Sequence, residues 1–585
     1  MATIDSTWLK NQKPAKWFRA MLLAFAVSLP IASCTGATQE IKKPAASPKV
    51  EIMQPRSMYD GDAFLYYILG QLYIREQNWE EAEKAFSQVV EADKKAIDAR
   101  IFVSHLAVQR GNINQAVEYT QEVVKLDPEH LKSRMLLASL LTAQKKHQEA
   151  SVQYEILLEN DKNDSAARML LARSYGFLKD KKRAESTLKP LFKDKKLAWK
   201  AYLTLGRVLA SIPDLEGATK AFYKAHRLGP EKMQPVLSLG VILQKLNRPA
   251  ESEKVYRDYL SDYPENKAIH SRLGRLLLNQ NDRGGALEEF RAISSLAPDN
   301  IQARLTTGLI LLSEHKYNEA LQELRLAEAA EPGNSTVQYY IGQSLEFLNT
   351  PKPAEQVYLK ISQEEPFFPE AQLRIAHIET TSDRTDQAIA RVENLVKQYP
   401  KKVIYIKALS LIQLQAENYS ATVEISSKGL ALDPEHSELL FNRAMAFDKL
   451  NMWAKAEKDL RVYIERNPND AHALNYLGYT WAEKNIYLEE ARKLLERAVR
   501  LAPDDGFVAD SLGWVLYRLK DYKESLTSMK KAVLLEPKDP TIHEHLGDVL
   551  HAMGKKKQAM KIWKKALKLE PKNQKLQDKI KKNSK

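Results

Sequence analysis

Small and apolar residues recur along this chain with a period of 34 residues. One position of the period is alanine, and it is occupied by Ala82, Ala116, Ala150, Ala184, Ala218, Ala286, Ala320, Ala354, Ala388, Ala456, Ala491 and Ala559. A glycine position stands 12 residues upstream, with Gly70, Gly206, Gly240, Gly274, Gly308, Gly342, Gly478, Gly513 and Gly547. A proline position stands 12 residues downstream; it runs from Pro128 to Pro571 and shifts by one residue between Pro468 and Pro503. Since a proline cannot continue a helix, each one marks a helix end, and the two small positions allow two helices to approach closely.

The 34-residue unit resembles the tetratricopeptide repeat, in which each unit is an antiparallel pair of helices. Fifteen units can be counted, and they start at residues 63, 97, 131, 165, 199, 233, 267, 301, 335, 369, 403, 437, 471, 506 and 540. Runs that alternate polar and apolar residues, as a strand would, are absent from the sequence. The chain is therefore predicted to be all-α, and the resemblance implies a right-handed superhelix of about fifteen helix pairs with a concave and a convex face.

Some units depart from the pattern. In the fourth unit Pro190 falls inside the expected second helix, so we predict a short or bent helix near residues 187–195. Pro351 instead stands where a second helix begins, and proline suits a first turn. In the tenth and eleventh units the glycine position holds Ala376 and Ser410, and we expect a break or softening of the array there.

The N-terminus is typical of a bacterial secretion signal. A short apolar run, Ala20 to Leu29, follows the basic residues Lys10, Lys13, Lys16 and Arg19. It ends at Ile31-Ala32-Ser33-Cys34, which resembles the lipobox, where the signal is cleaved before a cysteine that is then acylated. Residues 1–33 are thus predicted to be a lipoprotein signal peptide and Cys34 a membrane anchor, with residues 34–62 as a flexible tether. The alternative is that Cys34, the single cysteine, is an incidental small residue.

Positive charge is concentrated at the C-terminal end. The chain has a formal net charge of +13, but residues 553–585 hold thirteen lysines against Glu570 and Asp578. We interpret residues 573–585 as a basic segment that caps the repeat array at 63–572, because an exposed solenoid end needs a polar face. Docking of these lysines on anionic lipid or phosphate-bearing glycans is the alternative.

No sequence motif indicates catalysis. A glycine-rich phosphate loop, a nucleophile elbow and a His-Glu-x-x-His motif are all missing from the sequence. His543, His545 and His551 are close in sequence, but their spacing does not bring three imidazoles to one side of a helix. We interpret them as polar residues of a helix surface, and we predict no enzyme activity, no cofactor, no metal and no nucleic-acid partner.

Function is then expected on the surfaces of the repeats. Helical periodicity places positions 2, 5, 9 and 12 of each unit on one face of its first helix, and the resemblance implies that this face lines the concave groove. The two-carboxylate clamp of some relatives is absent, since position 5 is mostly apolar and Asn442 stands alone. One candidate site, the basic strip, consists of Lys132, Arg173, Lys200, Arg207 and Arg275. A second, the aromatic groove, consists of His472, Asn475, Tyr479, Phe507, Asp510, Trp514, Tyr517, Glu544 and Asp548.

Each candidate site has a simpler interpretation. The basic strip could be ordinary solvated charge, and residues of the aromatic groove could pack between helices. Aromatic residues among polar groups are, however, the usual content of a binding hot spot. Tyr479 and Trp514 occupy the same position in successive units, so we expect their side chains to be neighbours.

The aromatic groove also carries a narrower resemblance. The stretches Leu474–Tyr479, Asp510–Tyr517 and His545–Leu550 are similar to the C-terminal units of a family of bacterial outer-membrane lipoproteins built from these repeats. Some members are adaptors that bind a periplasmic carboxyl-terminal processing protease. The resemblance implies a protein-binding scaffold anchored at the outer membrane and facing the periplasm, and Thr35 after the cysteine fits that sorting. A pilotin-like assembly factor for a secretion, pilus or polysaccharide-export machine is the alternative.

Overall fold

The computed structural model describes residue 59 and residues 61–583. This part of the chain contains 31 α-helices, one 3₁₀ helix and no strand, so the all-α prediction is confirmed. The predicted signal peptide, Cys34 and nearly all of the tether lie outside the described residues. The described helices fall into two compact units, one that ends at Tyr340 and one that begins at Ile341, with the boundary inside helix α19.

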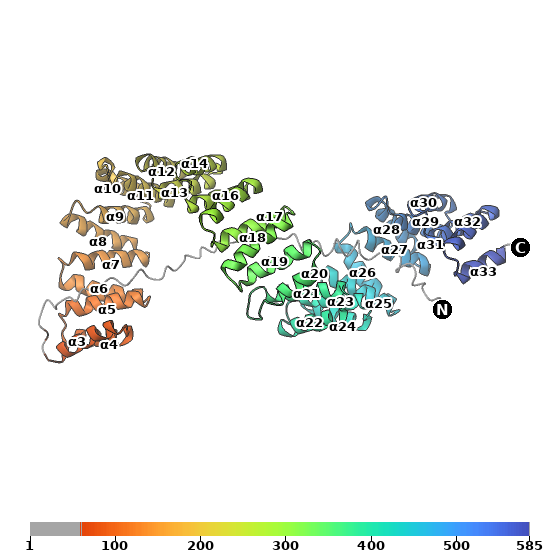
Figure 1. Ribbon diagram of the computed structural model, residues 1–585, viewed down its shortest axis with the longest axis horizontal. Helices are drawn as coiled ribbons and strands as arrows, with labels where there is room; N and C mark the ends of the chain where they lie inside the picture. The colour runs from red at the N-terminus through yellow and green to blue at the C-terminus, as the bar shows by residue number, and fades with distance from the viewer. Residues whose placement is uncertain (1–58, 60, 584–585) are drawn as a thin grey trace. The chain divides into compact units, whose positions relative to one another are not determined.

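Thirty of these helices form fifteen consecutive pairs, each with a first and a second helix (Figure 1). The first helices are α3 (Asp62–Arg75), α5 (Ile97–Gln109), α7 (Leu131–Ala143), α9 (Ser165–Phe177), α11 (Ala198–Ser211), α13 (Met233–Lys245), α15 (Lys267–Asn279), α17 (Ile301–Ser313), α19 (Ser335–Phe347), α21 (Phe368–Thr381), α23 (Val403–Gln415), α25 (Ser437–Lys449), α27 (Ala471–Lys484), α29 (Gly506–Arg518) and α31 (Pro540–Ala552). Each begins at the predicted start of its unit or one residue before it.

The second helices follow after short turns. They are α4 (Trp79–Ala92), α6 (Ile113–Leu126), α8 (His147–Asn160), α10 (Lys181–Leu188), α12 (Leu215–Leu228), α14 (Pro249–Asp262), α16 (Arg283–Leu296), α18 (Tyr317–Ala330), α20 (Pro351–Tyr358), α22 (Thr385–Gln398), α24 (Tyr419–Leu432), α26 (Trp453–Arg466), α28 (Leu488–Leu501), α30 (Tyr522–Leu535) and α32 (Lys556–Leu569). A last helix, α33 (Gln574–Asn583), follows the fifteenth pair.

The turn inside each pair contains a residue with positive φ. In the thirteenth pair the segment from this residue to the second helix is one residue longer, and the extra residue accounts for the one-residue shift of the proline position. In most pairs the turn has a single such residue, for example Asn247 or Asn281. Between α27 and α28 there are two, Asn485 and Tyr487. The inserted residue therefore lengthens a turn and leaves the helices on both sides in register with their partners.

Close packing inside each pair explains the glycine position. The glycine faces a large side chain sixteen residues later, as in Gly70 with Phe86, Gly206 with Phe222, Gly240 with Tyr256, Gly274 with Phe290, Gly342 with Tyr358, and Gly547 with Trp563. A Cβ atom at Gly240 would lie 2.1 Å from the Tyr256 hydroxyl oxygen. Since a packed core cannot accept so short a contact, only glycine leaves room for the ring. The twelve alanines of the alanine position are completely buried, as helix contact requires.

Two second helices are shorter than the rest. Helix α10 ends at Leu188 and continues as the 3₁₀ helix η1 (Lys189–Lys193), which contains Pro190, so the predicted short helix is confirmed. Helix α20 starts at Pro351 as expected but ends at Tyr358, which the regular spacing did not predict. Turns and bends occupy most of residues 359–367 before α21 begins.

Candidate functional site

The aromatic groove lies on three consecutive first helices, α27, α29 and α31. Each helix is preceded by an aspartate, Asp470, Asp505 or Asp539, whose carboxylate accepts hydrogen bonds from backbone N–H groups of the first turn. Such caps fix where a helix begins and hence which residues share a face. Of the nine predicted residues only His472 is exposed, and the other eight are half-buried or buried.

Trp514 packs against the following repeat. Its ring is stacked on Tyr517, with centroids 4.9 Å apart, and on His545 of α31, with centroids 4.2 Å apart. The guanidinium carbon of Arg518 lies 5.6 Å from the same ring. Part of the indole therefore serves packing between repeats, as the simpler interpretation of the aromatic groove proposed. The predicted contact between Tyr479 and Trp514 stays a prediction.

A buried ion pair joins the last two first helices of the groove. The Nδ1 atom of His545 lies 2.9 Å from Oδ2 of Asp510, and both side chains are buried. Burial alone would lower the pKa of His545, but the charge of Asp510 and its hydrogen bond outweigh burial and raise the pKa to about 9. At neutral pH the pair is thus an imidazolium and a carboxylate that neutralise each other.

The other two carboxylates of the aromatic groove are also paired within the chain. Lys579, on α33, binds Glu544 and lies 2.9 Å from both carboxylate oxygens of Asp548. Burial alone would lower the pKa of Lys579, but the charges of Asp548 and Glu544 raise it. Asp548 accepts a further hydrogen bond of 2.9 Å from Nε1 of Trp563. The acidic residues predicted to face a partner therefore hold the capping helix.

The interpretation of His543 and His545 as surface residues is wrong. Both are buried, and Nδ1 of His543 lies 2.7 Å from the carbonyl oxygen of Asp539. From the sequence, these histidines were considered only as ligands of one shared metal ion. Side chains one repeat away were not considered as their hydrogen-bond or ion-pair partners. It also missed Lys579, because that lysine stands in a run of lysines. The one available signal is spacing, since Asp510 and His545 are separated by 35 residues, close to one repeat.

Two polar atoms of the aromatic groove are buried without a hydrogen-bond partner in the described part of the chain. They are Oδ1 of Asn475 and Nε1 of Trp514. Asn475 is 4% exposed. A buried acceptor and a buried donor without partners each cost free energy, and a ligand that supplies the missing partners recovers it.

Phe507 lines a hollow at the end of the aromatic groove. The hollow has a volume of about 460 Å³, and its other lining residues are Ala502, Pro503, Asp504, Asp505 and Glu536. Burial and the charges of Asp505 and Asp539 raise the pKa of Glu536. The hollow thus places an aromatic ring among carboxylates, which suits a partner side chain with an apolar stem and a positive end.

The basic strip lies on α7, α9, α11 and α15 in the unit that ends at Tyr340. All five side chains are exposed, and none forms an ion pair with a described residue. Arg173 and Arg207 occupy the same position in successive repeats. Although Arg207 is exposed, desolvation by the surrounding protein and the charge of Arg173 lower its pKa. Two neighbouring guanidinium groups that have no carboxylate partner among the described residues favour the approach of an anion.

Sequence models described as tetratricopeptide repeat match residues 65–95, 107–174, 237–335, 441–506, 510–539 and 540–573. Together these matches cover more than half of the 585 residues. The chain is a tetratricopeptide-repeat (TPR) protein.

Several known proteins are similar to this chain or to part of it. The TPR repeat-containing protein PA4667 of Pseudomonas aeruginosa is 35% identical over 185 residues, which is 31% of this chain and 30% of that protein. Protein O-mannosyl-transferase TMTC1 of Homo sapiens is 27% identical over 28% of this chain and 19% of its own length. The chain thus spans less than a third of the length of these relatives. The solved structure of Naa15/Naa10 bound to HypK-THB covers 89% of this chain and 94% of its own, at 15% identity and a TM-score of 0.34.

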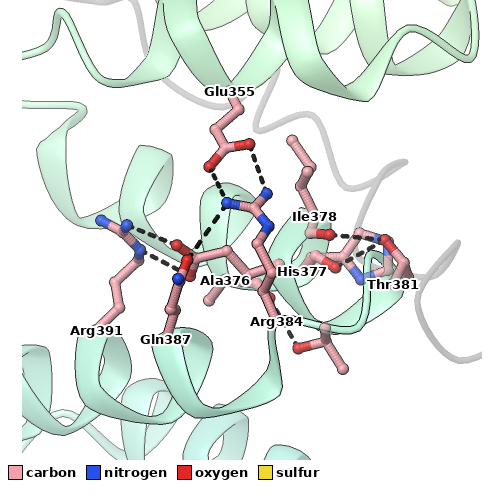
Figure 2. A network of polar contacts seen from close by, with 10 residues as sticks. Glu355, Ala376, His377, Ile378, Thr381, Arg384, Gln387 and Arg391 are labelled. Atoms are coloured by element: carbon pink, nitrogen blue, oxygen red, sulfur yellow. Dashed lines mark hydrogen bonds and ion pairs between the residues drawn. The ribbon is translucent and has the colours of Figure 1, made fainter.

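A polar network replaces part of the TPR core in the ninth and tenth units. Figure 2 shows Arg384 reaching from the start of α22 to Glu355 on α20, with nitrogen–oxygen distances of 2.8 and 2.6 Å. Arg391 binds both carboxylate oxygens of Glu379, at 2.7 and 3.0 Å, and donates to Gln372 as well. The hydrogen bonds from Arg384 lower the pKa of Glu355. An open hollow of about 420 Å³ adjoins this network, and its lining includes Phe368 and Asn394.

Within residues 59 and 61–583, no three His, Cys, Asp or Glu side chains are grouped as a metal ion would need. In the same part of the chain, no helix combines the length and the apolar character required to cross a bilayer.

Proposed function

We propose that this TPR protein is a lipid-anchored scaffold of the bacterial periplasm that binds protein partners in the aromatic groove. TPR proteins generally mediate protein–protein interactions. The observation that carries the proposal is a pair of buried polar atoms on adjacent repeats, Asn475 Oδ1 and Trp514 Nε1, which have no hydrogen-bond partner among the described residues. A peptide backbone offers the matching groups, because its N–H donates to the amide oxygen and its carbonyl accepts from the indole.

The surroundings of these two atoms favour a peptide ligand over a highly charged one. The three carboxylates of the aromatic groove are paired within the chain, Asp510 with His545, and Glu544 and Asp548 with the single Lys579. Half-buried rings at Tyr479, Trp514 and Tyr517 remain as apolar contact area. A partially desolvated aromatic surface with a few orienting polar groups is the usual composition of a protein-binding hot spot. The basic strip is a separate surface suited to acidic segments of the same or another partner.

The partner we propose is a periplasmic processing protease or its client proteins, and the alternative is a secretion, pilus or polysaccharide-export machine. The first is supported by the resemblance of Leu474–Tyr479, Asp510–Tyr517 and His545–Leu550 to the adaptor family. Cross-linking in intact cells followed by mass spectrometry separates the two, because it recovers either a protease with its clients or a secretin or exporter.

Changing Asn475 to leucine and Trp514 to phenylalanine together is expected to reduce partner capture roughly tenfold. The two changes remove the unpartnered oxygen and N–H group while a ring still stacks on His545, and two hydrogen bonds contribute about 1–3 kcal/mol. The measurement is the amount of each protein captured by the immobilised chain from solubilised cell envelopes. Urea unfolding is expected to change little, since no internal hydrogen bond is lost.

Trp481→Phe is the matched control for this double variant. Nε1 of Trp481 is also buried and has no hydrogen-bond partner within residues 59 and 61–583, but this tryptophan lies in the core and is 2% exposed. Capture should stay at the wild-type level in this control. Equal capture by the wild type and the double variant would remove the aromatic groove as the binding site.

Changing Cys34 to serine is expected to move the chain from the membrane to the soluble fraction, or to leave its signal uncleaved. A thioether-linked lipid on Cys34 is the anchor that the sequence predicts, and two or more acyl chains hold a protein stably at a bilayer. The measurement combines membrane fractionation with incorporation of labelled palmitate. Ser33→Ala keeps a small residue before the cysteine and should behave as wild type. An unlabelled wild type whose fractionation does not depend on Cys34 would exclude the anchor.

A further inference from the structure

The first helix of the array has an apolar face that the other repeats bury. In all fourteen later units the third and tenth residues of the repeat are buried. The second helix of one pair packs on the first helix of the next, as α4 does on α5 and α6 does on α7. In the first unit the same two positions are Leu65 and Leu72, and they are 55% and 45% exposed.

This exposed face is a single stripe along α3. Ile68 lies between Leu65 and Leu72 and is also exposed, and Phe64 widens the stripe. The spacing of three and four residues places all of them on one side of the helix. An exposed apolar stripe that matches a buried interface elsewhere in the same molecule indicates a surface made for another helix.

The other end of the array is closed differently. Helix α33 covers α32 with the buried side chain of Leu576 and is held by Lys579. Its outer residues include the exposed Lys575, Lys581 and Lys582. Head-to-tail stacking of copies would therefore bury lysines against the apolar stripe, which is unfavourable. Pairing of α3 with α3 brings no lysine against the apolar stripe.

Charges at the two ends of the stripe make it self-complementary. Asp62 stands one turn before Leu65, and Arg75 stands one turn after Leu72. Neither side chain forms an ion pair with a described residue, and both are exposed. In an antiparallel pair of α3 helices, each Asp62 faces Arg75 of the second copy, and the helix dipoles also oppose each other.

We propose that two copies of this chain form a symmetric dimer through the Asp62–Arg75 stripe of α3. The two-fold axis passes near Ile68, the midpoint of the stripe. A dimer of this kind carries two aromatic grooves and two basic strips, so a partner with two binding segments gains affinity by avidity. This inference does not depend on which partner the aromatic groove binds.

The test uses the full chain with Cys34→Ser, which removes the only thiol. Sedimentation equilibrium is expected to give twice the mass of 66.7 kDa. Leu65→Lys with Leu72→Lys should give a monomer with an unchanged far-ultraviolet spectrum. Leu534→Lys is the matched control, because Leu534 is 79% exposed on the second helix α30 and is not part of the stripe, and this variant should remain a dimer.

A charge exchange tests the antiparallel register. Asp62→Arg and Arg75→Asp should each raise the dimer dissociation constant several-fold, and the two changes together should restore it. In the Cys34→Ser background, Ile68→Cys should cross-link to a dimer with a short bismaleimide, whereas Leu534→Cys should not. The proposal is overturned by a wild-type monomer at all concentrations, or by a dimer that survives the two lysine changes. A full chain that is monomeric and dimerises only when residues 1–58 are deleted would assign the stripe to that segment and also overturn the proposal.

Discussion

Changing Asp510 to alanine is expected to lower the free energy of unfolding by about 3–5 kcal/mol, which would make it one of the most destabilising single changes in this chain. The change leaves the imidazolium of His545 buried without its counter-ion, under the ring of Trp514. It also opens a small cavity between α29 and α31. The measurement is urea unfolding, together with hydrogen exchange of residues 506–552, because repeat arrays can unfold in parts.

The same ion pair predicts a defined pH dependence. Below a pH of about 6.5, His545 is protonated in the folded and unfolded chains, so the stability that His545 contributes is fully present as long as Asp510 is ionised. Between that pH and the folded pKa of about 9 the unfolded chain releases the proton while the folded chain retains it. Stability contributed by His545 is therefore lost as the pH rises through this window, by an amount on the order of 3 kcal/mol.

Two variants control for these effects. Asp510→Leu with His545→Leu removes both charges, and apolar replacement of a buried ion pair is often neutral, so most of the lost stability should return. The decline between pH 6.5 and 9 should weaken in this variant. Asp504→Ala removes an exposed carboxylate from the turn before α29, the helix that carries Asp510. This change should alter the free energy of unfolding by no more than about 0.5 kcal/mol. A wild type and double variant with identical pH profiles would show that His545 does not hold its proton in this way.

Changing Glu379 to alanine is expected to destabilise the tenth repeat by about 3–5 kcal/mol. Glu379 is 1% exposed on its side chain and holds Arg391 with two hydrogen bonds, so its loss leaves a guanidinium facing a cavity. Hydrogen exchange of α21 and α22 measures the effect locally, and urea unfolding measures it for the chain.

The sixth repeat supplies the control for Glu379. The positions that hold Gln372, Glu379 and Arg391 in the tenth repeat are occupied there by Val236, Leu243 and Val255, all buried. A chain with Gln372→Val, Glu379→Leu and Arg391→Val copies that apolar arrangement and should be at least as stable as the wild type. A triple variant as unstable as Glu379→Ala would mean that the network has a role that an apolar core cannot replace.

The comparison of these two repeats shows how far the period of the sequence determines the structure. The repeated prolines, alanines and glycines mark helix ends and helix contacts within one unit or with the next unit. These features recur along the array. For that reason the sequence predicted the fifteen helix pairs, their starts to within one residue and the short helix at Pro190. The glycine position could be predicted to be a contact between helices. The large side chain that packs against each glycine was identified only from the structure.

The candidate site was predicted less completely, because its chemistry depends on residues that depart from the period. Asp510, Glu544 and Asp548 lie on the first helices that the period predicted, but their partners His545 and Lys579 stand about one repeat away in sequence and could be matched only by packing. Sequence position also cannot distinguish a histidine that is exposed from one that is buried, and so the burial of His543 was missed.

What the sequence by itself determined is the helical repeat, because hydrophobic spacing and helix-ending prolines act locally and are repeated fifteen times. What only the tertiary structure decided is which polar groups are satisfied. Asn475 and Trp514 each have a buried polar atom without a hydrogen-bond partner in the part of the chain that the structure describes, whereas Glu379 and Asp510 form ion pairs. Leu65 and Leu72 are exposed, although the equivalent residues of every later repeat are buried. Whether a residue is buried or paired depends on the helix that packs against it. The sequence of a single repeat does not specify that neighbouring helix.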